Sequence, residues 1–293
     1  MGFREDWLEA VERKNSVVCA GLDPAECEMG RGDKGLPPNV NKKEWSLAYL
    51  EAIAPYCSAI KPNIQYWKNL SDGMNNLGEI SRLARELGLV VIDDSKLADI
   101  DETNDAGIYS AKNRGADAVT VAPFAGNLEQ TIKQGKSIGV GIISMCLMSN
   151  PEYEREKNKL VPINSDDYNP QDIIVVNGVN YVRQYVQLAC DAARFCADGI
   201  VIGAPSQKNH IRNEEIENVR RYAGENMLVL LPGVGAQGGE AGAIWRHFGT
   251  DRVIVNVGRS LMFSEGSDST PVEQAAAARS YQEMLNNLRT KAA

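Results

Sequence analysis

The feature that most constrains the fold is an alternation, along the whole chain, of short apolar runs with stretches of helical character. Short apolar runs bounded by turn or charged residues are typical of buried parallel strands. Strands that alternate with helices indicate parallel βαβ units, and eight such units favour a closed barrel over an open sheet. The sequence therefore predicts an α/β protein with a (β/α)₈ or TIM barrel. The expected strands are residues 16–22, 59–63, 89–94, 118–122, 140–145, 199–203, 227–232 and 252–257.

The length of the chain suits one barrel. It has 293 residues, of which 43% are hydrophobic, and barrels of this type have about 250 residues with room for insertions. We therefore expect a single domain over residues 1–293. Residues 1–14 are rich in charge, lack the apolar centre of a signal peptide and predict an amphipathic helix. The sequence has no run of about 18 apolar residues, the length needed to span a membrane, so we expect no membrane span.

Charge argues against one class of partner, and the cysteine content indicates the compartment. The net charge is −8 and the isoelectric point is about 5.0, which argues against a nucleic-acid-binding surface. An anionic ligand would therefore need a local positive site. The six cysteines include no C-x-x-C pair, which predicts reduced thiols in a cytoplasmic protein.

Two long segments interrupt the alternation of strands and helices. Residues 27–41 follow the first expected strand, and residues 150–170 follow the fifth. In a barrel, the loops after the strands lie at the C-terminal face, where active sites are built. We therefore expect both segments to be lid elements, with plain disordered loops as the alternative.

Charged residues gather where the first three expected strands end. Asp94 and Lys96 are two residues apart, so their side chains point the same way in an extended chain, and Asp99 follows after a turn. Asp23 and Lys61 lie at the ends of the first two strands. A single charge at a strand end is more often structural, and ion pairs there are weak. Five charges on one predicted face indicate an active site.

Glycine-rich loops follow the seventh and eighth expected strands, at residues 231–239 and 257–260. Glycines let backbone N–H groups approach an anion closely, and barrels often hold a phosphate between these two loops. Gln237 and Arg259 are suitable donors, and the Arg259 guanidinium offers a bidentate fork. The alternative is that the glycines serve only the turns, but the position of both loops favours a phosphate site.

Taken in order, these motifs resemble those of the orotidine 5'-phosphate decarboxylase family. Their order and spacing involve five of the eight expected strands and extend over nearly the whole chain. The N-terminal helix and the 27–41 segment resemble the longer bacterial branch of that family. The matching stretches are Gly21-Leu22-Asp23, Lys61-Pro62, Asp94-x-Lys96-x-x-Asp99, the Pro232-to-Gly239 loop and Gly258-Arg259-Ser260.

The resemblance implies decarboxylation of orotidine 5'-monophosphate to uridine 5'-monophosphate and CO₂, the last step of de novo pyrimidine nucleotide synthesis. It implies that Asp94 faces the substrate carboxylate and that Lys96 delivers the proton. It also implies a homodimer with shared sites, in which Asp99 and Thr103 reach the neighbouring subunit. For the other parts of the substrate, the resemblance implies that Asp23 and Lys61 bind the ribose and that Ser149 contacts the pyrimidine. It implies that Gln237, Gly258 and Arg259 hold the phosphate and that Pro232 also binds the substrate.

The chain departs from the family pattern at two places. Asp101 occupies a position where many members have proline, so the turn after Asp99 differs and carries extra negative charge. The segment 150–170 is longer than in compact members. Either Ser149 or Ser144 could therefore be the serine that contacts the pyrimidine.

The expected chemistry needs no cofactor, because the sequence has no pyridoxal-type lysine context and no thiamine or flavin motif. We expect Asp94 to raise the energy of the bound substrate carboxylate by like-charge repulsion, which binding at the remote phosphate offsets. Lys96 would stabilise the developing carbanion and protonate it. Lys61 and Lys96 would be kept charged and oriented by Asp23 and Asp99.

Two other functions are compatible with parts of the pattern. One is a Mg²⁺-dependent sugar-phosphate decarboxylase or aldolase-like enzyme of the same superfamily. Those enzymes place a carboxylate at the end of the second strand as a hard oxygen ligand, where this chain has Lys61, which would repel the metal. The other is a nucleotide-phosphate-binding protein without catalytic activity, which the complete set of five charges disfavours.

Overall fold

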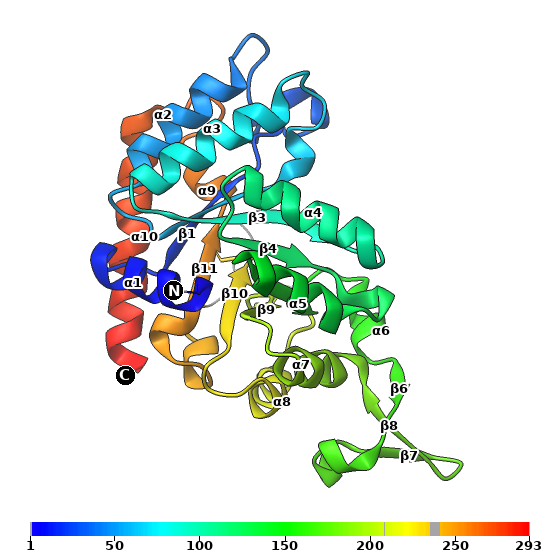
Figure 1. Cartoon of the computed structure of the whole chain (residues 1–293). Coiled ribbons are helices and arrows are strands. Elements are labelled where there is room, and N and C mark those ends of the chain that lie inside the picture. The colour runs from blue at the N-terminus through cyan, green and yellow to red at the C-terminus, as the bar shows by residue number, and fades with distance from the viewer. Residues whose placement is uncertain (1, 208, 235–240, 293) are drawn as a thin grey trace.

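The computed structural model describes residues 2–207, 209–234 and 241–292. Eight parallel strands form a closed barrel in the order β1-β11-β10-β9-β5-β4-β3-β2 (Figure 1). The predicted (β/α)₈ barrel is confirmed, and each expected strand coincides with a barrel strand. The third and fifth strands extend further at their C-terminal ends than predicted. The barrel strands are β1 (Val18–Leu22), β2 (Ala59–Pro62), β3 (Val90–Leu97), β4 (Ala118–Val121), β5 (Gly141–Leu147), β9 (Gly199–Ile202), β10 (Leu228–Pro232) and β11 (Val253–Val257).

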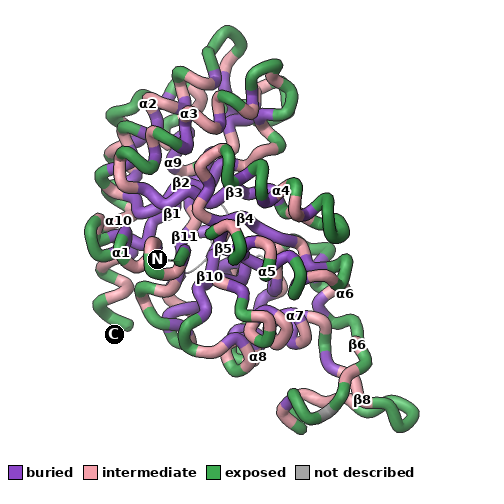
Figure 2. The backbone as a smooth tube through the Cα atoms, in the orientation of Figure 1, coloured by how far each residue is buried: buried purple, intermediate pink, exposed green. Residues whose placement is uncertain are grey.

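Helices surround the barrel, so that both faces of the strands are covered and the strands read as continuous apolar runs. All five residues of β1 are buried, and Figure 2 shows buried residues in the barrel with exposed residues on the outer turns of the helices. In α3, Leu77, Ile80 and Ala84 are buried at helical spacing and form the face toward the strands. The helices are α1 (Phe3–Lys14), α2 (Lys42–Ile53), α3 (Gly73–Glu86), α4 (Asp101–Asn113), α5 (Leu128–Ile138), α6 (Tyr153–Lys157), α7 (Gln184–Arg194), α8 (Asn213–Ala223), α9 (Arg259–Met262) and α10 (Pro271–Ala292).

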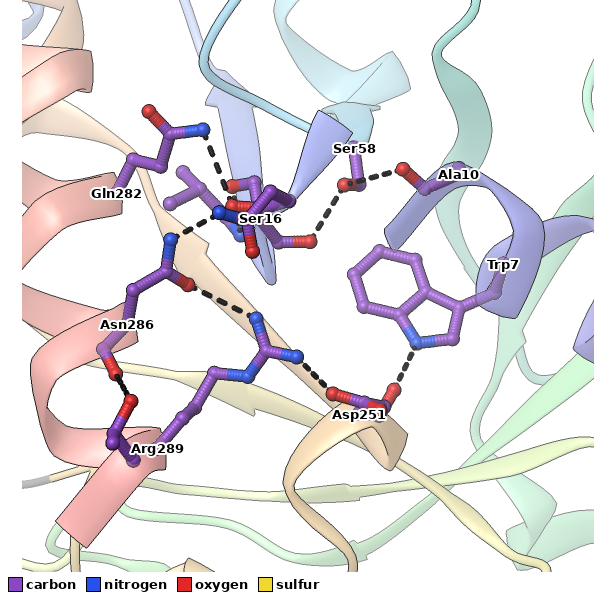
Figure 3. Close-up of polar contacts among 11 residues, drawn as sticks. Trp7, Ala10, Ser16, Ser58, Asp251, Gln282, Asn286 and Arg289 are labelled. Carbon is purple, nitrogen blue, oxygen red and sulfur yellow. Dashed lines mark hydrogen bonds and ion pairs between the residues drawn. The ribbon is translucent and has the colours of Figure 1, made fainter. Parts of the chain in front are cut away.

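The predicted N-terminal helix is α1, which packs at the end of the barrel where the strands begin (Figure 3). The Trp7 side chain is fully buried, and its indole Nε1–H donates to the backbone carbonyl of Asp251 at 2.7 Å. The buried Ser58 hydroxyl, just before β2, contacts the carbonyls of Ala10 at 3.2 Å and Ser16 at 2.7 Å. Arg289 of α10 pairs with the Asp251 carboxylate. These contacts close the end of the barrel opposite to the strand ends that carry the predicted site.

The segment after β5 is more ordered than the predicted loop. It contains α6 and the first strand of a three-stranded antiparallel sheet, which projects away from the barrel (Figure 1). The alternative of a plain disordered loop over residues 150–170 is therefore wrong, because β6 in that segment pairs with β8 further along the chain. The sheet has the order β6-β8-β7, with β6 at Leu160–Pro162, β7 at Ile174–Val176 and β8 at Val179–Arg183.

The turn between β7 and β8 is Asn177-Gly178, and both residues have positive φ angles, of 51° and 78°. This is the sequence signal of a two-residue β-hairpin when it lies between β-branched residues, as it does here. The eight strands predicted from the sequence do not include this hairpin. The role of this segment and of the segment after β1 as lids stays a prediction.

Candidate active site

A cavity of about 380 Å³ opens at the C-terminal ends of the barrel strands. This is the face at which barrel enzymes build their active sites. Residues from seven of the eight barrel strands, and from the loops that follow strands, line the cavity, so the closed sheet fixes their relative positions. The predicted site residues that line it are Asp23, Lys61, Asp94, Lys96, Ser149, Pro232, Gly258 and Arg259.

The Asp94 carboxylate lies between two lysines. The Lys61 ammonium pairs with its Oδ2 atom, and the Lys96 Nζ lies 2.6 Å from its Oδ1 atom. Asp94 and Lys61 are buried, whereas 44% of the Lys96 side chain is exposed. The Lys96 ammonium is therefore accessible from the cavity, while Lys61 and Asp94 form a fixed buried pair beneath it.

Electrostatics keep this buried pair charged. Burial alone opposes ionisation of Asp94, but the ammonium groups of Lys61 and Lys96 outweigh it and hold the pKa of Asp94 below its usual range. Burial likewise disfavours the charged form of Lys61, but the carboxylates of Asp94 and Asp23 outweigh it and raise the Lys61 pKa above its usual value. At neutral pH the site therefore presents an ionised carboxylate held between cations.

The backbone around Lys96 is unusual. The prediction ended the third strand at Asp94, but β3 continues to Leu97, and its register against β4 shifts between Asp93 and Leu97. Lys96 has a φ angle of 48°, in the left-handed region that residues other than glycine rarely adopt. Such conformations persist where the surroundings enforce them and are frequent at functional sites.

Asp23 follows β1 and has an unused acceptor. Among the described residues, nothing donates a hydrogen bond to its buried Oδ1 atom. Burial raises the pKa of Asp23, although the nearby Lys61 ammonium opposes that shift. A buried acceptor without a partner is costly, so this atom is well placed to accept a hydrogen bond from a ligand hydroxyl.

The loops after β10 and β11 form another part of the cavity wall. Gly233 and Val234 line it from the first loop, next to Pro232 at the end of β10, and Gly258 and Arg259 line it from the second. Gly258 is the residue before the short helix α9, which begins at the exposed Arg259. Gln237, the other predicted phosphate donor, lies outside the described residues.

Gly21 is required by this close packing. A Cβ atom at Gly21 would lie 2.9 Å from the Cα atom of Gly258, because β1 and the loop after β11 approach each other there. Any larger residue at position 21 would therefore displace the loop that carries Arg259. The Gly-Leu-Asp motif at the end of the first strand thus has a steric reason as well as a chemical one.

The structure separates the two candidate serines. Ser149 lines the cavity, whereas Ser144 in β5 is fully buried and is not part of the wall. Asp99 and Thr103 are exposed and lie outside the cavity of their own chain. The Asp99 carboxylate instead accepts the backbone N–H of Ile100 at 2.8 Å, just before α4.

Several lining residues were missed in the sequence. Arg31 and Lys34 reach the cavity from the segment after β1, which contains short 3₁₀ turns at Cys27–Met29 and Gly32–Lys34. Their cationic side chains after a first strand were a usable signal. Thr120 in β4 also lines the cavity and contacts Asp94, and nothing in the local sequence singles it out.

Comparison with known proteins gives a consistent result. The chain matches the Orotidine 5'-phosphate decarboxylase / HUMPS family over residues 16–277. The orotidine 5'-phosphate decarboxylase of Polaromonas naphthalenivorans is 31% identical, over 90% of this chain and 88% of its own length. That of Corynebacterium glutamicum strain R is 30% identical, over 94% of this chain and 96% of its own.

Solved structures share the fold. The OMP decarboxylase of Leishmania donovani superposes with a TM-score of 0.72 at 22% identity, covering 99% of each chain. The orotidine 5'-monophosphate decarboxylase of Methanocaldococcus jannaschii, complexed with the inhibitor BMP, gives 0.62 at 24% identity, covering 92% of this chain and 98% of its own. Because the family match and the similarity to the curated relatives extend over most of the sequence, this chain belongs to the Orotidine 5'-phosphate decarboxylase / HUMPS family.

Proposed function

We propose that this protein converts orotidine 5'-monophosphate to uridine 5'-monophosphate and CO₂, the last step of de novo pyrimidine nucleotide synthesis. The observation that carries the proposal is the buried, ionised Asp94 held between Lys61 and Lys96 at the base of the cavity. The two curated relatives described above are both named orotidine 5'-phosphate decarboxylase, which supports the same reaction.

In this proposal the site does its chemistry through charge placement. The substrate carboxylate binds beside Asp94, whose charge is fixed by its two lysine partners, and the repulsion raises the energy of the bound substrate. As CO₂ leaves, negative charge develops on ring carbon 6, and the Lys96 ammonium stabilises it and then donates a proton. Contacts to the remote phosphate offset the cost of bringing the two carboxylates together.

The remaining lining residues have binding roles in the proposal. The free acceptor of Asp23 and the ammonium of Lys61 bind the ribose hydroxyls, and Ser149 contacts the pyrimidine. Arg259, the Gly258 backbone and Gln237 hold the phosphate, and Pro232 also binds the substrate. Lys61 lies where the metal-dependent alternative would need a carboxylate ligand, and its ammonium disfavours a divalent cation there. We therefore propose that the reaction needs neither metal nor cofactor.

The experiment that tests this function is the loss of ultraviolet absorbance of orotidine 5'-monophosphate on adding purified protein in excess chelator. We expect turnover at a rate that chelator does not change. In the same assay, Arg259→Ala should raise KM by about 10²-fold with a smaller change in kcat, because a charge-assisted contact to phosphate is removed far from the reacting carbon.

Three results would contradict these assignments. Absence of turnover with intact folding would exclude the decarboxylase, and recovery of activity only with added Mg²⁺ would favour the metal-dependent alternative. An unchanged KM in Arg259→Ala would remove Arg259 from the phosphate site.

Lys133→Ala is a suitable control for Arg259→Ala, because it removes a cation away from the cavity. Lys133 pairs with Glu129 on the surface of α5.

We also propose a homodimer in which Asp99 and Thr103 complete the active site of the neighbouring subunit. Both residues are exposed and lie outside the cavity of their own chain. Large apolar side chains at the start of α4, within α4 and after β4 are also exposed: Ile100 to 61%, Tyr109 to 60% and Phe124 to 53%. Exposed apolar groups of this size are what a subunit interface would cover.

Mixing two inactive variants tests the shared site. Lys96→Ala and Asp99→Ala should each lose turnover alone. After subunit exchange, half of the dimers are mixed and each contains one native site, so roughly one quarter of wild-type activity should return. No recovery, with exchange verified by a mass-tagged subunit, would contradict a site shared between chains.

We propose that residues 1–293 act as one catalytic domain in the cytoplasm. A single cluster of buried side chains extends from Phe3 to Leu285. All six cysteines are free, which fits a reducing compartment. In the part of the chain that the structure describes, no helix is long and apolar enough to cross a membrane.

A further inference from the structure

We propose that Thr120 is a positioning residue that holds Asp94 and Lys96 in their working geometry. The proposal rests on the function proposed above and deepens it. It states that the relative positions of Asp94 and Lys96 depend on the Thr120 hydroxyl of the neighbouring strand. Thr120 is in β4, is 2% exposed, and its side chain lines the cavity.

The Thr120 hydroxyl makes two contacts with different chemistry. It donates to Asp94 Oδ1 at 2.9 Å and accepts the backbone N–H of Lys96 at 3.0 Å. A hydroxyl has one proton to give and lone pairs to accept with, so both contacts form at once. One side chain thereby binds the carboxylate of one central residue and the backbone of the other.

The register of β3 against β4 explains why a side chain is needed here. Asp93 pairs with Val119, and Leu97 pairs with Val121. Three residues of β3, at positions 94–96, therefore lie opposite the single residue Thr120. A bulge of this kind leaves a backbone N–H without its ladder partner. The Thr120 oxygen accepts the N–H of Lys96 in place of the missing carbonyl.

The same contact stabilises the unusual backbone of Lys96. A φ angle of 48° costs energy in a lysine, and the hydrogen bond to Thr120 secures it. Asp94 gains as well, because its Oδ1 atom accepts from Thr120 and Lys96 while Oδ2 faces Lys61. Without the hydroxyl, the carboxylate could turn about its side-chain bonds and the Lys96 ammonium would lose its fixed position.

Two substitutions separate this role from simple packing. Thr120→Val keeps the shape and removes the hydroxyl, whereas Thr120→Ser keeps the hydroxyl. We expect Thr120→Val to lower kcat by roughly ten- to hundredfold, as for loss of a hydrogen bond to a charged group, with little change in KM. Thr120→Ser should restore most of kcat. Ser58→Ala is the matched control, since it removes another buried hydroxyl, which donates to a backbone carbonyl at the far end of the barrel.

A normal kcat in Thr120→Val would overturn the proposal, and so would an equal loss in Thr120→Ser. A second measurement is independent of turnover: denaturant unfolding of Thr120→Val, Asp94→Ala and the double variant. We expect Thr120→Val to shift the midpoint less when Asp94 is already alanine. Full additivity would contradict the hydrogen bond. If the effects of the two substitutions on stability are not additive but the wild-type protein has no turnover, the contact between Thr120 and Asp94 stands and only the proposed reaction is refuted.

Discussion

Lys96→Ala is expected to lose at least about 10⁴-fold in kcat, the upper range for removal of a general acid. In the proposed reaction the Lys96 ammonium both stabilises the carbanion and supplies its proton. It is also the exposed cation of the central group, with its Nζ 2.6 Å from Asp94. The measurement is the ultraviolet assay of orotidine 5'-monophosphate, with a single-turnover trace to separate chemistry from product release.

Binding should survive this substitution better than turnover does. Uridine 5'-monophosphate lacks the reacting carboxylate, so its affinity depends on the ribose and phosphate contacts and should change by less than about tenfold. Lys133→Ala, on the surface of α5, controls for loss of one positive charge. Residual turnover within tenfold of wild type in Lys96→Ala would remove Lys96 from the role of proton donor.

Asp94→Ala is expected to lower kcat by on the order of 10³-fold, comparable with removal of a preorganised electrostatic group. The physical reason is the loss of like-charge repulsion in the substrate complex together with the loss of the partner that orients Lys96. Affinity for uridine 5'-monophosphate should fall much less, because the product carries no carboxylate to repel. Equal losses in turnover and product affinity would contradict the repulsion mechanism.

The same substitution should reduce stability, with a defined pH dependence. Asp94→Ala leaves the buried Lys61 without its main partner, which costs about 3–5 kcal/mol for a broken buried pair. The pKa of Asp94 is lower in the folded protein than its unfolded value of about 3.9. Its contribution to the free energy of unfolding is therefore complete above that value and declines as the pH falls below it. Denaturant unfolding at pH 7 and pH 3 should show a smaller wild-type advantage at pH 3, and Asp94→Asn controls for shape.

Local sequence patterns predicted the barrel because barrel strands are covered on both faces. The full burial of β1 and the buried β9 at Gly199–Ile202 correspond to unbroken apolar runs in the sequence. Charges that end such runs stand out, so Asp23, Lys61 and Asp94 could be placed at one face from their positions alone. Those three residues do line one cavity, as does Lys96.

Other features depend on contacts between distant segments and could not be predicted in the same way. The extension of β3 to Leu97 requires a shifted pairing with β4, and the contact of Thr120 with Asp94 follows from that pairing. The small sheet after β5 forms because β6 pairs with β8, about twenty residues later. Asp99 and Thr103 remain outside the cavity of a single chain, so their proposed role depends on a second copy.

The closed barrel also determines when the protein can finish folding during its synthesis. Val18 of β1 pairs with Val255 of β11, so the first strand acquires its second neighbour only after residues 23–252 have left the ribosome. Until then one edge of β1 is open, and open strand edges are prone to pair with other chains. The packing of α1 is also late, because its hydrogen bonds with Asp251 and with Gln282 of α10 need segments that are made after most of the barrel. Closure of the barrel is therefore a late event in synthesis, because it requires β11, the last of the barrel strands in the chain.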